Sequence, residues 1–330
     1  MADPPVMSLE CGTIFTREED LKEGLFGGVF LFILEVLPYL RERGIKPHWR
    51  IDTTCYGNVV PTVLEPVEPV GPVLPEVSLS SLRQEDRRAI GGDFEGISKL
   101  WNSYFRPAQR VLDEVERIDP GLDRAIGIHY RGGDKLKASW DTNPIDRTVF
   151  MDIVQDRIAD EPVFDRCLVA TDDPAFIGTV RRRIDLPLTI LGAGERHKSS
   201  RAGRQSEDRA VMALRDAILL SRCRSILQTS SALPSFAKVL RPEVDCRRCT
   251  ASKWFAEIPY FPVAFVRKHR PVDPGLQAVV DKAMRGDWTT DHDVDPSVWN
   301  SIQVPWSMIA RSPMPTGRLG NLLRWVRRSA

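Results

Sequence analysis

The amino-acid sequence predicts an α/β protein built on a doubly wound parallel sheet. Over residues 125–240, short apolar segments alternate with segments long enough for helices, which is typical of βαβ units. The predicted strands end in polar residues, and parallel strands place those ends on one edge of a sheet. With 330 residues, the chain also exceeds the usual size of a single core, so we expect two domains.

Composition and charge exclude several classes of protein. Hydrophobic residues make up 42% and charged residues 28% of the chain, which is typical of a soluble globular enzyme. The net charge of +1 gives no field strong enough for nucleic acid to be the main partner. The first residues, MADPPVMSLEC, include two early acids and no apolar run, so we expect no secretory signal. The six scattered cysteines then favour reduced thiols and a cytoplasmic location.

A buried helix is expected near the N-terminus. Gly24–Leu40 is the most apolar stretch, but Glu35 and Pro38 interrupt it well short of a membrane span. We therefore expect a buried helix over Leu25–Arg43, followed by a strand over Pro47–Ile51.

The following segment ends the first domain. Pro61–Pro75 contains five prolines in fifteen residues, which excludes a regular helix and predicts an extended surface connection. The helical pattern resumes near Ser81 and is clearest in Pro107–Ile118. Asp119–Asp123 is a predicted break, and we place the domain boundary there, between residues 120 and 121.

The second half alternates regularly between strands and helices. The predicted strands are Ala125–His129, Cys167–Ala170, Leu186–Leu191 and Ser225–Gln228. The predicted helices are Asp146–Ile158, Pro174–Ile184, Glu207–Ser221 and Pro234–Leu240. Right-handed crossovers between such strands give a parallel sheet.

Two further segments are unusual in composition. Gly192–Ser206 is polar, glycine-rich and basic; we favour a solvated loop, with a lid over an anionic ligand as the alternative. Cys246 and Cys249 form a CxxC pattern, but no second pair of cysteines or histidines completes a zinc site. We expect a structural or incidental role for both cysteines.

The ends of three predicted strands carry residues that suit a nucleotide. The first strand leads into HYRGGDK, the second into TDDP and the fourth into TSS. The guanidinium of Arg131 suits a phosphate, and the hydroxyl and N–H groups of Thr229–Ser231 precede a helix, where a second phosphate oxygen can bind. Asp172 or Asp173 would accept hydrogen bonds from ribose hydroxyls or a base edge. Because ligands of open parallel sheets lie beyond these ends, we predict a nucleoside diphosphate site.

Each motif also has a simpler structural interpretation. An arginine in a turn is usually a surface charge, and TDDP and TSS are usually helix caps. GxGxxG and GxxxxGK[ST] are absent from the expected places, which argues against a dinucleotide dehydrogenase and a P-loop kinase. Asp216 lies next to the apolar face of the predicted helix Glu207–Ser221, and the pattern alone favours the solvent edge for it.

Three blocks of sequence resemble one family of enzymes. IGIHYRGGDK, CLVATDDP and DRAVMALRDAILLSRCRSILQTSSALPSFAKVL follow the order found in the α1,6-fucosyltransferase and protein O-fucosyltransferase superfamily. They resemble above all the core α1,6-fucosyltransferases and the rhizobial nodulation fucosyltransferases, over roughly Ala125–Leu240. The resemblance implies a GT-B-type glycosyltransferase with two Rossmann-like domains, which uses GDP-fucose, inverts configuration and needs no metal or other cofactor.

The resemblance also implies roles for individual residues. Arg131 would hold the β-phosphate and stabilise the leaving diphosphate, and Asp216 would read the guanine edge. Gly27 and Gly28 would form a loop facing the donor. The residues implied to bind the donor are His129, Lys135, Asp172, Asp173, Asp216, Thr229, Ser230, Ser231, Gly27 and Gly28.

The catalytic base departs from the family pattern. Inversion needs the acceptor hydroxyl to be deprotonated on the face opposite the leaving group. In core fucosyltransferases the presumed base is a Glu four residues after the motif's Lys, and Ser139 holds that position here. Asp134 and Asp141 are the remaining candidates. Transfer from another nucleotide-sugar and a non-catalytic nucleotide- or glycan-binding role remain open as alternatives.

The predicted organisation has three parts. Residues 1–120 form an acceptor-side α/β domain, 121–265 a domain for the GDP-sugar, and 266–330 a tail that packs back. The tail ends in a basic amphipathic helix over Gly317–Ala330; packing on its own protein is favoured, and contact with an anionic membrane is the alternative. The expected acceptor is an oligosaccharide, polysaccharide or lipo-oligosaccharide on the cytoplasmic side.

Overall fold

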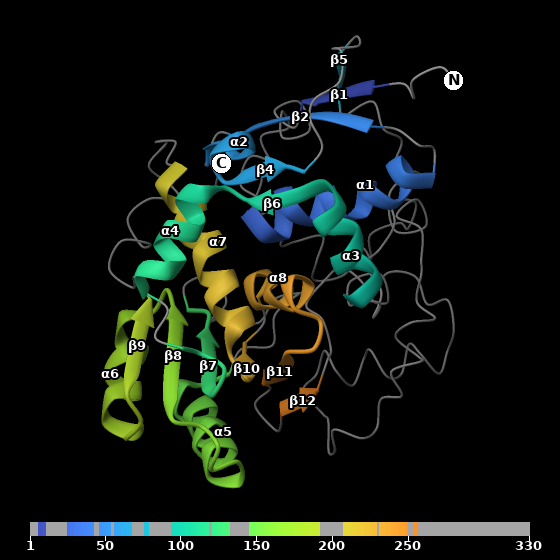
Figure 1. Cartoon of the computed structure of the whole chain (residues 1–330). Coiled ribbons are helices and arrows are strands. Elements are labelled where there is room, and N and C mark those ends of the chain that lie inside the picture. The colour runs from blue at the N-terminus through green and yellow to red at the C-terminus, as the bar shows by residue number, and fades with distance from the viewer. Residues whose placement is uncertain are drawn as a thin grey trace, which may run out of the picture.

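The structure is a computed structural model that describes residues 6–10, 25–42, 46–53, 56–67, 76–78, 94–118, 121–132, 145–191, 207–229, 231–249 and 254–256. Figure 1 shows the N-terminal elements, in blue, above a larger sheet whose strands run from green to orange. Helices α4 (Gln109–Ile118), α7 (Glu207–Arg222) and α8 (Ala232–Leu240) lie between these two parts of the molecule (Figure 1).

The larger sheet has six strands. In spatial order they are β12 (Trp254–Ala256), β11 (Asp245–Cys249), β10 (Ser225–Gln228), β7 (Ala125–Tyr130), β8 (Arg166–Thr171) and β9 (Leu188–Leu191). Neighbouring strands are parallel except at the edge, where β12 runs antiparallel to β11. The chain moves outward from β7 to β9 and then returns to the other side of β7 as β10. The strand order therefore reverses between β7 and β10, which is where sheets of this type bind ligands.

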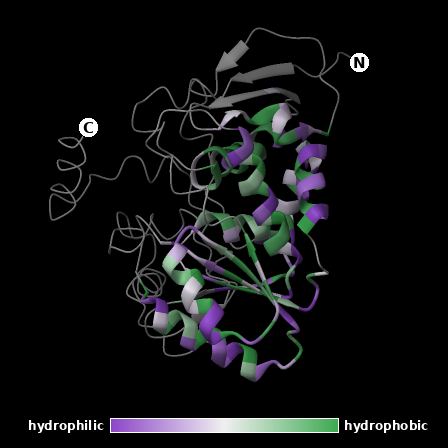
Figure 2. Ribbon diagram, turned by 90° about the vertical axis from the view of Figure 1, so that its left-hand side faces the viewer, coloured by the Kyte–Doolittle hydropathy of each residue, from purple (hydrophilic) through white to green (hydrophobic). Residues whose placement is uncertain are grey.

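Helices cover both faces of this sheet, so the predicted doubly wound α/β fold is confirmed. On one face, α5 (Arg147–Asp160) and α6 (Pro174–Arg183) pack against Ile126, Ile128 and Val169. On the other, α7 (Glu207–Arg222) and α8 (Ala232–Leu240) pack against Ala125 and Leu168. In Figure 2 the helices around the sheet carry hydrophobic residues on one side and hydrophilic residues on the other, as burial of a single face requires.

The predicted elements of the second half are all present, with small shifts. Helix α8 begins at Ala232, two residues before the expected Pro234, because a proline in the first helical turn costs no hydrogen bond within the helix. Strands β11 and β12 were not expected from the sequence. They extend the sheet through the segment that contains the CxxC pattern.

The N-terminal part has two smaller sheets and several helices. One sheet has the order β3 (Gly57–Asn58), β2 (Lys46–Thr53), β1 (Val6–Glu10) and β5 (Glu76–Ser78), and the other pairs β4 (Leu64–Pro66) with β6 (Phe105–Pro107). The helices are η3 (Leu25–Phe30), α1 (Leu31–Glu42), α2 (Val59–Thr62), α3 (Phe94–Tyr104) and α4 (Gln109–Ile118).

The buried N-terminal helix is confirmed over Leu25–Glu42, with a π-helical first part. The extended conformation predicted for Pro61–Pro75 is wrong at its start. There α2 forms a short turn, closed by the Val63 N–H donating to Val59 O over 2.9 Å, and β4 follows.

One apolar core joins the two parts of the chain. Phe236 of α8 lies 5.2 Å from Phe26, 5.0 Å from Phe30 and 4.9 Å from Trp101, measured between ring centroids. These partners belong to η3 and α3, on the other side of the predicted boundary at residue 120, and all four rings are buried. The division into domains stays a prediction. Among the described residues, no helix is both long and apolar enough to cross a bilayer.

Candidate functional site

The three predicted strand ends lie side by side. Strand β7 is central, with β8 on one side and β10 on the other, and Tyr130 pairs with Thr171 while His129 pairs with Gln228. Beyond the last pair, the Thr229 N–H donates to His129 O over 3.0 Å. The sequence motifs HYRG, TDD and the start of TSS therefore meet at one edge of the sheet, beside the reversal of strand order.

Two threonine hydroxyls fix the end of β7 from both sides. Thr171 Oγ1 donates to Tyr130 O over 2.7 Å, and the Arg131 N–H donates to Thr229 Oγ1 over 2.8 Å. Thr229 thus holds the backbone of Arg131, a contact that its predicted role in binding the donor did not include. The role of Thr171 was missed because a buried threonine in a strand gives no signal of its own in the sequence.

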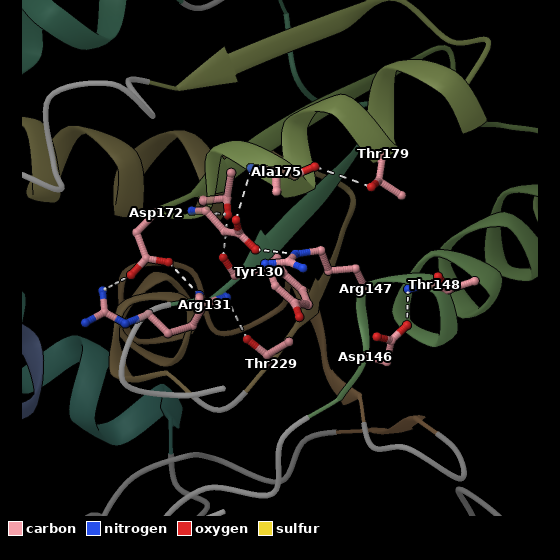
Figure 3. Close-up of polar contacts among 12 residues, drawn as sticks. Tyr130, Arg131, Asp146, Arg147, Thr148, Asp172, Ala175, Thr179 and Thr229 are labelled. Atoms are coloured by element: carbon pink, nitrogen blue, oxygen red, sulfur yellow. Dashed lines mark hydrogen bonds and ion pairs between the residues drawn. The ribbon is translucent and has the colours of Figure 1, made fainter. Parts of the chain in front are cut away.

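Arg131 projects from this fixed backbone into an ion pair. Its Nη1 lies 2.9 Å from Asp172 Oδ2, and Asp172 Oδ1 accepts from the Gly132 N–H over 2.6 Å (Figure 3). The Arg131 side chain is 41% exposed and that of Asp172 only 13%, so the carboxylate is inside and the guanidinium faces outward. Asp172 therefore orients the guanidinium, and this contact explains its place in the TDDP motif.

Glycine is required after Arg131 because the two strand ends approach closely. A Cβ on Gly132 would lie 2.8 Å from the Cβ of Asp173 and 3.3 Å from Asp172 Oδ1. The contact with the Asp173 Cβ is shorter than real Cβ atoms show, so a larger residue would push Arg131 and Asp172 apart.

Asp173 has a different role from its neighbour. Its Oδ1 caps α6 by accepting from the Ala175 N–H over 3.0 Å, and its Oδ2 lies 2.5 Å from Arg147 Nε (Figure 3). The hydrogen bond to Asp173 raises the pKa of the Arg147 guanidinium above its usual value. Both contacts organise the helices behind the site. Arg147 was missed by the sequence analysis, which gave it no role beyond its place in the predicted helix Asp146–Ile158.

The β10 end leads into the N-terminus of α8. Ser231 is the N-cap residue of α8, and its side chain makes no capping hydrogen bond. The first N–H groups of a helix point out of its end and favour anions. A Cβ on Gly27 would lie 3.7 Å from the Cβ of Ala232, so η3 packs against this first turn of α8. The loop predicted for Gly27 and Gly28 is wrong, because both lie in the helical turn η3, whose apolar neighbours are buried.

Two predicted residues are deeply buried. His129 is almost fully buried within the end of β7, and Asp216 is fully buried on α7. The solvent-edge position that the pattern favoured for Asp216 is therefore wrong. Arg215 explains the burial: its Nε and Nη2 both donate to Asp216 Oδ1, over 3.0 Å and 2.8 Å, and supply the opposite charge.

Other predicted residues lie outside the part of the chain that the structure describes. They are Asp134, Lys135, Asp141 and Ser230, together with Ser139, the loop Gly192–Ser206 and the tail helix Gly317–Ala330.

The CxxC pattern lies within β11. Cys246 and Cys249 are three residues apart on a strand, so they face opposite sides of the sheet and belong to different apolar clusters. Burial raises the pKa of the Cys249 thiol, which favours its protonated form. Within the described ranges, no group of three or more His, Cys, Asp or Glu side chains is arranged to hold a metal ion.

The arrangement is suited to an anionic ligand. A guanidinium held by a partly buried carboxylate, an N-cap hydroxyl and the N–H groups of a helix N-terminus lie at the reversal of strand order. These groups offer several hydrogen-bond donors to the oxygens of a phosphate or diphosphate.

Comparisons with known proteins point to solved structures only. No family model and no curated protein matches the chain. A NodZ α1,6-fucosyltransferase soaked with GDP-fucose has 15% identity, covers 78% of this chain and 100% of its own, and gives a TM-score of 0.48. The selenomethionine form of NodZ from Bradyrhizobium has 14% identity, with 77% and 97% covered and a TM-score of 0.45. POFUT1 in complex with GDP has 7% identity, with 74% and 97% covered and a TM-score of 0.46. Both NodZ structures are of a fucosyltransferase.

Proposed function

We propose that the protein is an inverting fucosyltransferase that transfers L-fucose from GDP-fucose to a hydroxyl of a glycan or glycoconjugate. The observation that carries the proposal is the placement of Arg131. Its guanidinium is oriented by Asp172 and partly open to solvent at the reversal between β7 and β10. The sequence blocks around Arg131, Asp172 and Thr229 are those that resemble the fucosyltransferase superfamily.

The diphosphate of the donor would lie between Arg131 and the first turn of α8. Negative charge develops on the β-phosphate as the glycosidic bond breaks. A guanidinium held in place stabilises that charge without reorganising, and this is the task that a metal performs in other enzymes. The hydroxyl of Ser231 and the N–H groups of α8 would bind the remaining phosphate oxygens.

The nucleoside would be read by the residues that the resemblance assigns to it. Asp216 would accept from the guanine edge and His129 would lie beside the nucleotide. Asp216 is held ready for this role by Arg215, which occupies its Oδ1 with two hydrogen bonds. On the acceptor side, Asp134 or Asp141 would take the proton as the hydroxyl attacks the anomeric carbon from the opposite face.

Nucleotide titration tests the donor site. We expect GDP to bind more tightly than UDP or ADP without added metal. Replacing Arg131 with alanine should weaken GDP binding about 10- to 100-fold, the cost of a charge-assisted hydrogen bond. Arg124→Ala is the matched control, because Arg124 precedes the same strand at its other end and also pairs with a carboxylate, Asp165, over 3.4 Å. Equal binding of GDP by both variants would contradict the proposal.

Hydrolysis of the donor distinguishes the remaining alternatives. Slow release of GDP from GDP-fucose without an acceptor indicates a glycosyltransferase, and a panel of GDP-, UDP- and ADP-sugars identifies the sugar. Tight GDP binding without hydrolysis of any donor would instead favour a non-catalytic nucleotide-binding relative, as the serine at position 139 allows.

A further inference from the structure

A buried amide lies directly behind the turn between β10 and α8. Gln228, the last residue of β10, is only 1% exposed. One end of its amide lies 3.2 Å from both Thr229 O and Ser231 O. Carbonyl oxygens only accept hydrogen bonds, so the amide nitrogen is the end that faces them, and its two N–H groups serve the two carbonyls.

The other end of the same amide contacts β11. The amide oxygen lies 3.2 Å from Cys246 Sγ, and the single S–H proton donates either to this oxygen or to Pro234 O, which lies 3.8 Å from the same sulfur. Cys246 is buried on the face of the sheet that α8 covers. Gln228 and Cys246 therefore connect the turn and the first part of α8 to two strands of the sheet, which gives the first cysteine of the CxxC pattern a structural role.

This contact fixes the direction of the backbone N–H groups. In a trans peptide the C=O and the N–H point to opposite sides. Because Ser231 O points toward Gln228, the N–H of Ala232 points away from it, out of the first turn of α8. The Gln228 amide and the Ser235 hydroxyl, which donates to the same Ser231 O over 3.3 Å, together hold this peptide in that orientation.

We propose that Gln228 is a positioning residue for the diphosphate: its amide holds the β10–α8 turn in the conformation that presents N–H and hydroxyl donors to phosphate oxygens. The identity of the ligand as GDP rests on the proposed function, whereas the positioning of an anion by this turn does not. The chemistry also explains why the residue is a glutamine. A buried leucine would remove the donor that faces both carbonyl oxygens and leave Ser231 O with the Ser235 hydroxyl, which donates to it over 3.3 Å. A glutamate would face the two carbonyls with a further acceptor.

The test separates the diphosphate from the nucleoside. Gln228→Leu and Gln228→Glu are titrated with GDP, with guanosine and with inorganic pyrophosphate. We expect each variant to bind GDP and pyrophosphate about tenfold more weakly than the wild type, with guanosine binding unchanged. Gln155→Leu is the matched control, because Gln155 of α5 also donates to a carbonyl oxygen, Arg183 O, over 2.9 Å, but on the opposite face of the sheet. It should leave all three affinities unchanged.

Each outcome decides between the proposals. Equal losses for guanosine and GDP, or no loss for pyrophosphate, would overturn the positioning role. If the wild type bound pyrophosphate but did not prefer GDP to UDP or ADP, the proposed donor would be overturned. The affinities of the Gln228 variants for pyrophosphate would then decide the role of Gln228. If both variants fail to fold, the side-chain NH₂ resonances of Gln228 in the wild-type protein provide the measurement. They should shift when pyrophosphate binds, and unchanged resonances would contradict the inference.

Discussion

At the scale of single residues, burial determines how Tyr130 responds to pH. Tyr130 is 1% exposed at the end of β7, its ring stacks on Phe176 at a centroid distance of 4.3 Å, and its hydroxyl donates to Ile145 O over 2.9 Å. Burial away from water disfavours the phenolate and raises the pKa of Tyr130 from 10.0 to about 12. The residue that precedes Arg131 is thus held as a neutral hydrogen-bond donor.

The raised pKa predicts a loss of stability at high pH. Because the folded pKa exceeds the unfolded one, the contribution of Tyr130 is complete below pH 10.0 and is lost as the pH rises toward about 12. The loss should reach about 2–3 kcal/mol, measured as the free energy of unfolding in urea. Tyr130→Phe should lower the stability at neutral pH and flatten this dependence. Tyr39→Phe, on α1, is the control: it keeps Tyr130 and should lose stability at high pH as the wild type does. If the free energy of unfolding depended on pH equally in both variants, Tyr130 would not be the group responsible.

The sequence was a good guide to which residues meet at the site. It was a poorer guide to the contacts that each of them makes. Arg131, Asp172 and Thr229 follow three strands whose parallel order could be predicted from the alternation of elements, so their convergence followed. The direction of a hydroxyl or carboxylate depends on distances of a few tenths of an ångström, which no spacing encodes. Asp216 illustrates the difference: the helical pattern favoured the solvent edge for it and gave no sign of its buried pairing with the neighbouring Arg215.

At the scale of elements, strand β11 shows why charged segments escape prediction. Its sequence, DCRRC, lacks the apolar alternation of the other strands. The structure tolerates it because Asp245 accepts from Ser225 Oγ over 3.0 Å, from Arg157 Nη2 over 2.9 Å and from Arg247 Nε over 2.9 Å. Those partners come from β10, α5 and β11 itself. A strand that is stabilised by distant partners cannot be recognised from its own residues.

Arg241, which follows α8, contacts the C-terminal end of helix α7. Arg241 Nη1 donates to Ser221 O, Arg222 O and Cys223 O over 3.1, 3.2 and 3.4 Å. These are carbonyls that the helix leaves without partners, and a cation there also interacts favourably with the helix dipole. We expect Arg241→Ala to lower the free energy of unfolding by about 1–2 kcal/mol and Arg241→Lys by less, because lysine keeps the charge.

Chemical denaturation measures this difference, and GDP titration of the folded variants provides the control. Arg241 lies at the amino end of the sheet, where α7 leads into β10, so the affinity for GDP should be unchanged. A stability equal to that of the wild type, or a loss as large in the lysine variant as in the alanine variant, would contradict the capping role.

At the scale of the whole molecule, the aromatic cluster of η3, α3 and α8 makes the two parts of the chain depend on each other. Phe236 contacts rings on three other side chains, and all of them are buried. Helix α8 begins at the candidate diphosphate site, so the same element that presents N–H donors also carries the contact with the N-terminal part. The proposed binding site and the packing between the parts therefore share one helix of nine residues.

This linkage predicts how the protein unfolds. In the wild type, hydrogen exchange measured in rising urea should show α3 and β7 losing protection together, because the shared core makes them one cooperative unit. Phe236→Ala should destabilise the protein by about 3–5 kcal/mol and make α3 lose protection at a lower urea concentration than β7. Phe150→Ala is the matched control: Phe150 is equally buried, but it belongs to the cluster on the other face of the sheet. Its loss should lower the stability by a similar amount while α3 and β7 still unfold together. Separate transitions in the wild type would mean instead that the parts on either side of residue 120 fold independently, and that α8 can present the diphosphate site without the N-terminal part in place.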